Sequence, residues 1–465
     1  MRIRKYDFNY SRRAFAEKVA KGLGAGVLAP LWPLAGRTAD VSKAYPDELL
    51  SIEVYTKGKI KPGDVVTASN VDVVKDLLDP IAYMQIKEQG RRINICDSTK
   101  DMSTLFPNDY FHSTLKNRGR GKVDSNGNLW TDGVDGHTWI GGLPFPDAKN
   151  GLECCINISQ SWGRHDYASY PIPMKSFGAD GKLSYRYDLI WFELQTTCRN
   201  DGAVFGGMGD RLRLNTALIN SPAESRGTTI MSSWFYDQRK FPELYGYLPA
   251  FRRVRQFPTN QRFEPLVPGV TFFLSDAWGA GDPSLTWGNF KIVERKPMLA
   301  AVSGKYNWQG GKDPDWDVPY HGGPAGQSFQ EKWFELVPEA IVWDSEPTGY
   351  PRAPVGVRRT WSDARSGMML TQVTRDRQGK LWKQIEFSHG QMKNDKAEVL
   401  DAKGHPEWSW NNALFHDIQS NRLTWMRHYR ELPGGYKSQF FNGVGSEDVY
   451  NKFFTTSALQ RLGAV

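Results

Sequence analysis

The stretch that decides the fold is "VGVRRTWSDARSGMMLTQVTRDRQGKLWKQIEF", residues 355–387. It divides into three strand-like runs, separated by turn-forming residues at 364–367 and at 376–379. Strands joined by such short turns are antiparallel neighbours. This region therefore predicts an antiparallel meander.

The same strand pattern extends outward from the meander, from about residue 91 onward. "SYRYDLIWFELQTTC" (184–198) and "TTIMSSWFYDQ" (228–238) are rich in aromatic and β-branched residues, and Asn126-Gly127 and Asp180-Gly181 are hairpin turn pairs. Strands do not alternate with long helices, which argues against a doubly wound parallel sheet. We expect a mainly β (α+β) protein.

Helix signals are confined to the two ends of this β-rich region. Residues 69–80 and 80–89 predict two short helices, capped by Ser69 and Asp79, and a C-terminal helix begins near Ser457 and ends at Gly463. We expect a signal region over 1–44, a lead-in with two short helices over 45–130, and a β domain over 131–465.

The positive charge of the chain is concentrated at its N-terminus. Lys and Arg number 59 against 51 Asp and Glu, a net charge of +8, and residues 1–44 hold nine of the basic and three of the acidic residues. The remainder is nearly balanced, so no nucleic-acid partner is expected.

The N-terminal basic residues form an export motif. "SRRAFAEK" places Arg12, Arg13, Phe15 and Lys18 at the defined positions of a twin-arginine signal, and residues 19–35 are too weakly apolar to span a membrane. This predicts passage through the twin-arginine translocase into the periplasm of a Gram-negative bacterium. The alternative is an amphipathic helix with an incidental arginine pair; cleavage after residue 44 or after residue 35 stays open.

Four cysteines would enter an oxidising compartment with the exported chain. We favour a disulfide from Cys154 or Cys155 to Cys198 or Cys96, with buried free thiols as the alternative.

Motifs for cofactors, metals and nucleophilic catalysis are missing from the sequence. There is no HExxH, GxSxG, phosphate-binding loop or strand-linked GxGxxG, so neither a cofactor nor a metal is expected. The calcium-like spacing at 124–136 fits a hairpin turn better. His165-Asp166 and His416 could serve acid–base chemistry, but adjacent residues on a strand face opposite sides. No catalytic residue is therefore assigned.

"FRRVRQF" (251–257) offers a cationic site within an apolar setting. On a strand, Arg253 and Arg255 share a face with Phe251 and Phe257, and could hold the polar end of a ligand. The alternative is an exposed strand whose arginines pair outward. The aromatic candidates for the apolar part, each also explicable as core, are Phe145, Trp162, Tyr187, Trp191, Trp234 and Trp361.

Four segments together resemble a known family of exported proteobacterial proteins. They are "VTASNVDVVKDLLDPIAYMQIKEQG" (66–90), "GGLPFPDAKNGLE" (141–153), "YLPAFRRVRQF" (247–257) and residues 358–383. They resemble the domain of unknown function 1329, assigned to the LolA/LolB-like superfamily of periplasmic lipid carriers. The resemblance implies a strongly curved antiparallel sheet, an unclosed half-barrel with short helices in or over its mouth, enclosing an apolar cavity. It also implies an outer-membrane β-barrel protein and an RND-type transporter as partners.

Three functions follow from these observations. The leading hypothesis is a periplasmic carrier or adaptor that binds a hydrophobic, lipid-like molecule in the half-barrel. The alternatives are an enzyme acting on a hydrophobic envelope substrate and a structural partner of an outer-membrane barrel or transporter.

Overall fold

The computed structural model describes residues 45, 47–259, 262–276, 281–308, 320–323, 328–443 and 446–464. The predicted export signal, with Arg12, Arg13, Phe15 and Lys18, lies outside the described residues. No helix within the described ranges is long and apolar enough to cross a membrane.

A 16-stranded sheet organises the molecule, and every neighbouring pair in it is antiparallel except β2 with β14. Its strands follow the order β1 (Val65–Val66), β2 (Ile93–Ile95), β14 (Trp333–Glu346), β15 (Val355–Asp363), β16 (Met369–Asp376), β17 (Leu381–Gln391), β18 (Trp408–Asp417), β19 (Arg422–Arg427), β5 (Tyr167–Phe177), β6 (Leu183–Gln195), β7 (Arg211–Ser221), β8 (Thr229–Phe235), β9 (Glu243–Leu248) and β10 (Arg253–Phe257). β11 (Gly288–Ala300) also pairs with β14, and β22 (Gln439–Phe441) with β5.

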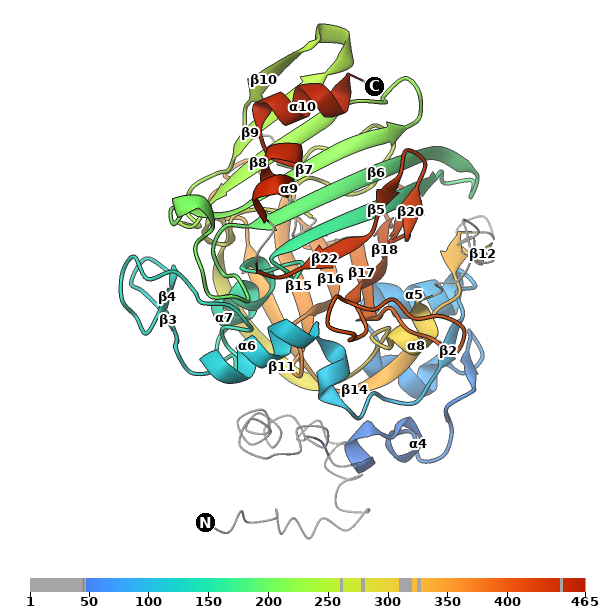
Figure 1. Cartoon of the computed structure of the whole chain (residues 1–465). Helices are drawn as coiled ribbons and strands as arrows, with labels where there is room; N and C mark the ends of the chain where they lie inside the picture. Colours follow the sequence, from blue (N-terminus) through green and yellow to red (C-terminus); the bar gives the residue numbers. More distant parts are fainter. Residues whose placement is uncertain are drawn as a thin grey trace, which may run out of the picture.

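The sheet is strongly curved (Figure 1). It is open because its two end strands, β1 and β10, do not pair with each other. Three two-stranded ribbons surround it: β3 (Gly121–Val123) with β4 (Leu129–Thr131), β12 (Tyr320–His321) with β13 (Phe329–Gln330), and β20 (Glu431–Leu432) with β21 (Tyr436–Lys437). The predicted meander is β15, β16 and β17, and the mainly β, open and curved sheet is confirmed.

Two halves of the sheet meet where β5 pairs with strands from near the C-terminus. β19 pairs with β5 from Leu423 opposite Phe177 to Met426 opposite Met174. β22 pairs with residues 167–169 of the same strand. Pro171 and Pro173 lie between these two stretches, and their cross-strand partners are in β6.

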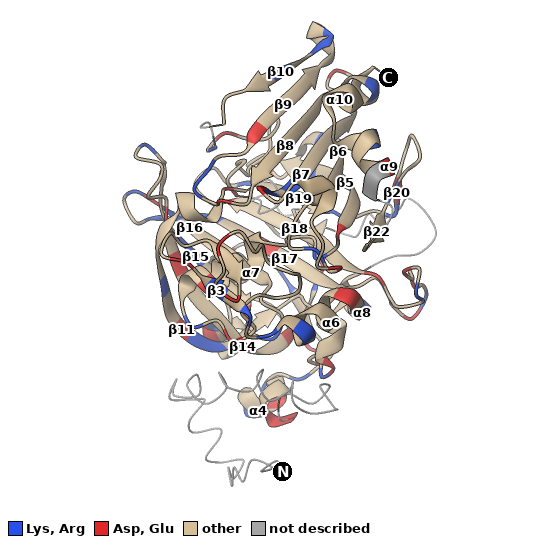
Figure 2. Ribbon diagram, turned by 60° about the vertical axis from the view of Figure 1, so that its left-hand side comes forward, with Lys and Arg blue, Asp and Glu red and all other residues tan. Residues whose placement is uncertain are grey.

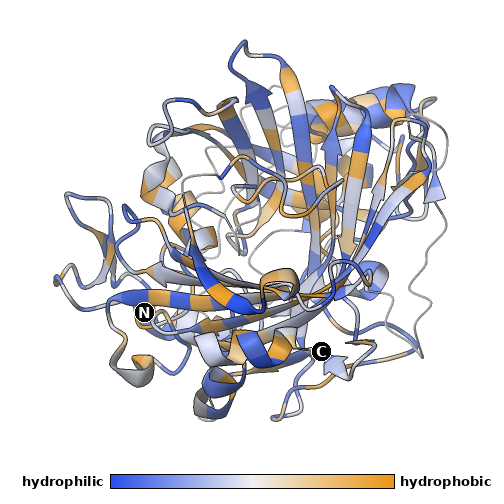
Figure 3. Cartoon of the chain, turned by 90° about the horizontal axis from the view of Figure 1, so that it is seen from above, coloured by the Kyte–Doolittle hydropathy of each residue, from blue (hydrophilic) through white to orange (hydrophobic). Residues whose placement is uncertain are grey.

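Figure 3 shows that hydrophobic residues recur along the strands. They form buried clusters on both faces of the sheet. On β6, Tyr187 and Leu189 belong to one apolar cluster, whereas Ile190 and Phe192 belong to another on the opposite side. The first side is the inner face, which contacts helix α7 (Gly151–Ser159) and residues 262–276. The opposite side is the outer face.

Short helices cover the outer face of both halves. α5 (Pro80–Glu88) contacts one half through Ile81, in a cluster with Val342 and Trp361. α9 (Ser446–Phe453) and α10 (Thr456–Gly463) cover the other half, where Phe453 stacks on Phe192 with ring centroids 3.9 Å apart. The remaining helical segments are η2 (Asp47–Leu50), α4 (Ile52–Tyr55), η3 (Val71–Leu77), η4 (Met102–Leu105), α6 (Asn108–Asn117), η5 (Phe205–Gly207), η6 (Pro249–Phe251), η7 (Ser284–Thr286) and α8 (Gly304–Asn307).

The two N-terminal helices differ in how well their predicted caps agree with the structure. Asp79 caps α5, as predicted, by accepting hydrogen bonds from the N–H groups of Ile81 and Ala82. The first helix is the 3-10 segment η3, whose N-cap is Asn70 rather than Ser69. Ser69 lies one residue before the N-cap, and its hydroxyl is hydrogen-bonded to the Thr67 hydroxyl at 2.9 Å.

The favoured disulfide prediction is wrong in this structure, where Cys96, Cys154, Cys155 and Cys198 are free and buried. Cys154 and Cys155 pack in the inner-face cluster, whereas Cys198 packs with a separate group around Trp234. Burial raises the pKa of the Cys154 and Cys198 thiols to about 12, so they are inert, small apolar side chains.

Candidate functional site

The inner face of β14–β19 and β5–β7, which we call the covered part, is a continuous apolar surface. Its cluster of buried residues contains Leu189, Trp343, Ile385, Phe387 and Phe415, contributed by strands far apart in the sheet order. Trp343 is fully buried, and its indole N–H donates to Ser362 Oγ at 3.0 Å. A surface of this kind suits acyl chains or other apolar groups, provided that its present cover moves.

Residues 262–276, which we call the cover segment, lie on this surface without joining the sheet. Val270 and Phe272 are buried in the inner-face cluster, and Leu266 and Val267 pack against it half-buried. The Phe272 and Phe415 ring centroids are 4.7 Å apart. Within the segment, an isolated bridge pairs Pro265 with Phe273.

A few polar contacts fix the middle of the cover segment. The Thr271 N–H donates to Thr424 Oγ1 at 3.0 Å, and the Thr271 hydroxyl donates to the Phe415 carbonyl at 2.9 Å. The Tyr187 hydroxyl donates to the Pro268 carbonyl at 3.0 Å. Gly269 has a φ of +82° and packs against the Tyr185 ring, so this turn requires glycine.

A buried ionic group, the Asp276 cluster, holds the end of the cover segment. Arg358 donates to Asp276 Oδ1 at 2.5 Å and to the Ser275 carbonyl at 2.7 Å. Lys383 Nζ donates to the Thr271 carbonyl at 2.7 Å and lies 3.5 Å from Asp276 Oδ2. Burial lowers the pKa of Lys383, against the opposing attraction of Asp276.

Aromatic rings complete the environment of the two cations. The Arg358 guanidinium lies 4.1 Å from the Trp287 ring centroid, and Lys383 Nζ lies 3.1 Å from that of Phe273. At the other end of the segment, Arg262 pairs with Asp282 at 2.8 Å. Both ends of the cover segment are thus fixed by buried ion pairs.

The inner face of β8–β10, which we call the open part, has a different character. Its inward residues Ile230, Leu244 and Phe257 are only half-buried, and Arg253 and Arg255 are exposed. Figure 2 shows basic residues at the tip of the β9–β10 hairpin. The Arg255 guanidinium lies 4.7 Å from the Phe251 ring centroid, and within the described residues neither arginine has a carboxylate partner.

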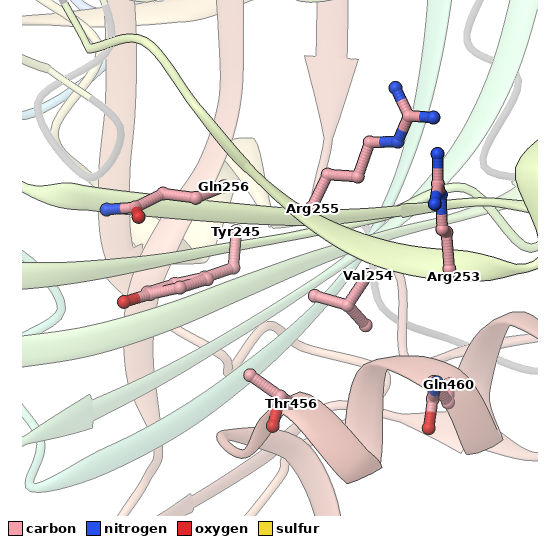
Figure 4. A pocket seen from close by; sticks show the side chains of 7 residues that line it. All are labelled: Tyr245, Arg253, Val254, Arg255, Gln256, Thr456 and Gln460. Carbon is pink, nitrogen blue, oxygen red and sulfur yellow. The ribbon is translucent and has the colours of Figure 1, made fainter.

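An open groove of about 400 Å³ lies on the other side of β10 (Figure 4). It is lined by Tyr245 of β9, by residues 253–256 of β10, and by Thr456 and Gln460 of α10. The guanidinium groups of Arg253 and Arg255 point away from that helix. The structure therefore places the two arginines at an exposed edge of the inner face, not inside its apolar concavity.

The aromatic residues singled out in the sequence are divided among several sites. Trp162, Tyr187 and Trp191 contact the covered part, and Phe145 packs beside it. Trp234 lies in a neighbouring group with Trp139 and Tyr236. Trp361 is on the outer face beneath α5, so it does not line the inner surface.

The histidines proposed for acid–base chemistry have other partners. His165 is hydrogen-bonded to the Trp408 carbonyl at 3.0 Å, whereas Asp166 pairs with Arg199 at 3.5 Å. His416 lies on the outer face, 2.9 Å from Gln85 Nε2. Burial lowers the pKa of His165 to about 4 and of His416 to about 3, so both are neutral structural groups.

Sequence reasoning missed Arg358, Lys383 and Asp276. Arg358 and Lys383 lie within the meander. The only sequence signal for them was a basic residue at a strand position that faces inward. Asp276 follows "TFFLS", whose setting gave no indication that this loop covers the sheet.

The comparisons with known proteins identify the family. A family model described as a protein of unknown function, DUF1329, matches residues 65–460. Among curated proteins no sequence matches. Solved structures similar to this chain include a DUF1329 family protein from Desulfovibrio piger ATCC 29098, with 13% identity, a TM-score of 0.41 and coverage of 66% of this chain and 97% of that one.

The LolA superfamily protein NE2245 from Nitrosomonas europaea is also similar, with 13% identity, a TM-score of 0.32 and coverage of 62% of this chain and 96% of that one. Likeness at this level carries no conclusion about a ligand. The match of the family model over most of the chain is decisive: the chain belongs to the DUF1329 family of proteins of unknown function.

Proposed function

We propose that the protein is a periplasmic carrier that binds a lipid-like molecule on the covered part of its inner face. The observation that carries this proposal is the cover itself. A broad apolar, aromatic surface is covered by the short helix α7 and by the irregular cover segment. A second sheet or long helices, which would make a permanent core, do not cover it within the described residues.

The energetics of exchange are compatible with such a role. An apolar ligand that replaces the cover segment buries the same surface, at about 25 cal/mol per Å² removed from water. In exchange, the sheet gives up its packing against the side chains of Val270 and Phe272, the hydrogen bonds of Thr271, and the contacts of the Asp276 cluster. The strands beneath keep their own ladders, so the sheet does not need to unfold.

The periplasmic location in this proposal is supported by the twin-arginine motif of residues 11–18. A carrier in that compartment would move a poorly soluble molecule between the two membranes. Its partners would be an outer-membrane β-barrel protein and an RND-type transporter, as the sequence resemblance implies. These partners are part of the proposal.

Lipid analysis tests the proposal directly. Protein purified from the periplasm is measured by native mass spectrometry and its organic extract is analysed; a bound lipid is expected. The fluorescence of N-phenyl-1-naphthylamine should rise on binding and fall when the extracted lipid is added. A protein that carries no lipid and leaves the probe dark would contradict the proposal.

A matched pair of variants locates the binding surface. Met426→Gln places an amide of similar size on the covered part and should lower probe affinity several-fold. Met84→Gln makes the same change on α5 at the outer face and should leave affinity unchanged. Equal effects of both substitutions would place binding elsewhere.

A further inference from the structure

We propose that Arg358 and Lys383 form a headgroup site for an anionic amphiphile, and that Asp276 occupies this site when no ligand is bound. This rests on the proposed function, because the same inner face holds the apolar part of the ligand. In the ligand-free protein, the cover segment then occupies the place of the ligand.

The first step is the charge balance of the Asp276 cluster. Two cationic side chains, 1% and 6% exposed, contact one carboxylate that is 2% exposed. Asp417 also attracts Lys383, but its oxygens accept hydrogen bonds from Trp382 and from backbone N–H groups. Arg358 Nε is buried and has no hydrogen-bond partner among the described residues. The site therefore has a hydrogen-bond donor, Arg358 Nε, that is available to an anion.

The second step is the geometry of the donors. Both terminal nitrogens of Arg358 and the Nζ of Lys383 converge on residues 275 and 276. A guanidinium fork beside an ammonium group matches the oxygens of a phosphate or a carboxylate. The aromatic rings of Trp287 and Phe273 shield the site from water, which strengthens its attraction for a negative charge.

The third step is the order of groups along the cover segment. Leu266, Val267, Val270 and Phe272 rest on the apolar surface, and the carboxylate of Asp276 comes last, between the two cations. An apolar stretch that ends in an anionic group has the layout of an amphiphile. A ligand of that class could replace the apolar contacts of the segment and the ionic contacts of Asp276.

Displacement then follows from competition for one site. The ligand shifts the segment off the sheet only by as much as it binds the uncovered state better. A carboxylate or phosphate that takes the place of Asp276 supplies this difference, because it keeps two buried cations paired. An uncharged amphiphile lacks it and should bind more weakly.

Three probes and three variants test the headgroup site. Dodecyl phosphate, dodecanoate and dodecyl maltoside are titrated below their micelle concentrations, and dissociation constants are measured calorimetrically. Asp276→Asn removes the competing carboxylate and should tighten binding of the two anionic probes about 10-fold, with a smaller change for the maltoside. Lys383→Gln should weaken only the anionic probes, by a similar factor.

Asp344→Asn is the matched control. Asp344 pairs with Arg359, the neighbour of Arg358 on the opposite face, at 2.8 Å, and its loss should change no affinity. Preference for dodecyl phosphate over dodecanoate, or the reverse, identifies the headgroup. Maltoside binding as tight as that of both anions, with Asp276→Asn silent, would overturn the headgroup site and leave the proposed function standing. Binding of no probe would overturn both.

Hydrogen exchange on the unmodified protein gives a readout that does not depend on the variants folding. Saturating dodecyl phosphate should speed amide exchange in residues 262–276, because the segment leaves the sheet. Slower or unchanged exchange there, with the probe bound, would overturn the inference.

Discussion

The covered and open parts of the inner face are built from the same sheet, yet they differ in burial and in charge pairing. Trp343 in the covered part is fully buried, whereas Phe257 in the open part is half-buried. Arg358 contacts Asp276 in the first, whereas Arg253 in the second is exposed. Alternation along a strand decides which face of the sheet a side chain lies on. The cover segment decides how far that side chain is buried and whether a charged group has a partner.

The largest expected difference between the two parts is in the stability lost when an aromatic side chain is removed. Trp343→Ala should lower the free energy of unfolding by about 4 kcal/mol, because it leaves a large cavity. Phe257→Ala should cost about 1 kcal/mol, since that ring is already partly in water. Denaturant unfolding of both variants measures the two values. Similar losses would mean that the open part is covered in solution.

Arginine substitutions compare the two parts by charge. Arg358→Gln should cost about 3 kcal/mol, because Asp276 keeps only the more distant Lys383 as a cationic partner. Arg253→Gln should change stability by less than about 0.5 kcal/mol, as expected of an exposed residue. Thermal unfolding at matched salt checks both. A costly Arg253→Gln would reveal a partner for the open part.

Glu407, beside the covered part, should make stability fall as pH rises. Burial raises its pKa to about 8, so between about pH 4.5 and 8 the folded state retains a proton that the unfolded state has lost. Glu407→Gln should remove this loss and stabilise the protein at pH 8.5 by on the order of 2 kcal/mol relative to wild type. A variant whose pH profile is unchanged would contradict the protonated state.

Acid should loosen the covered part before the open part. Burial lowers the pKa of His389 and His428 to about 3, so below pH 6.5 the unfolded state gains protons that the folded state excludes. Each histidine should then remove about 1.4 kcal/mol of stability per pH unit. Hydrogen exchange of β17 and β18 between pH 7 and 5 checks the order; earlier exchange in β9 and β10 would reverse it.

Local signals explain which elements were predictable from sequence. The meander and α10 were found because their turns and caps lie within a few residues of the strands and helix they end. The pairings of β14 with β11 and of β19 with β5 join distant segments, and no local pattern specifies them.

The candidate site was less accessible to sequence reasoning for the same reason. Arg253 and Arg255 attract notice because they lie two residues apart in one short segment, and the structure places them at an exposed edge. Arg358, Lys383 and Asp276 meet only when a loop folds over two strands, and "RFEPLVPGVTFFLSD" has the Pro and Gly content of an ordinary loop. Its role is decided by tertiary packing.

The prolines of β5 have a consequence for the protein during its synthesis. Until residues 422–441 leave the ribosome, β5 has β6 on one side and no strand on the other. Such an edge invites pairing with other chains, and proline blocks it because it has no N–H to donate. Pro171 and Pro173 sit in the stretch that neither β19 nor β22 later pairs. We therefore expect them to protect the nascent chain from pairing with other chains, without costing the finished sheet a strand pairing.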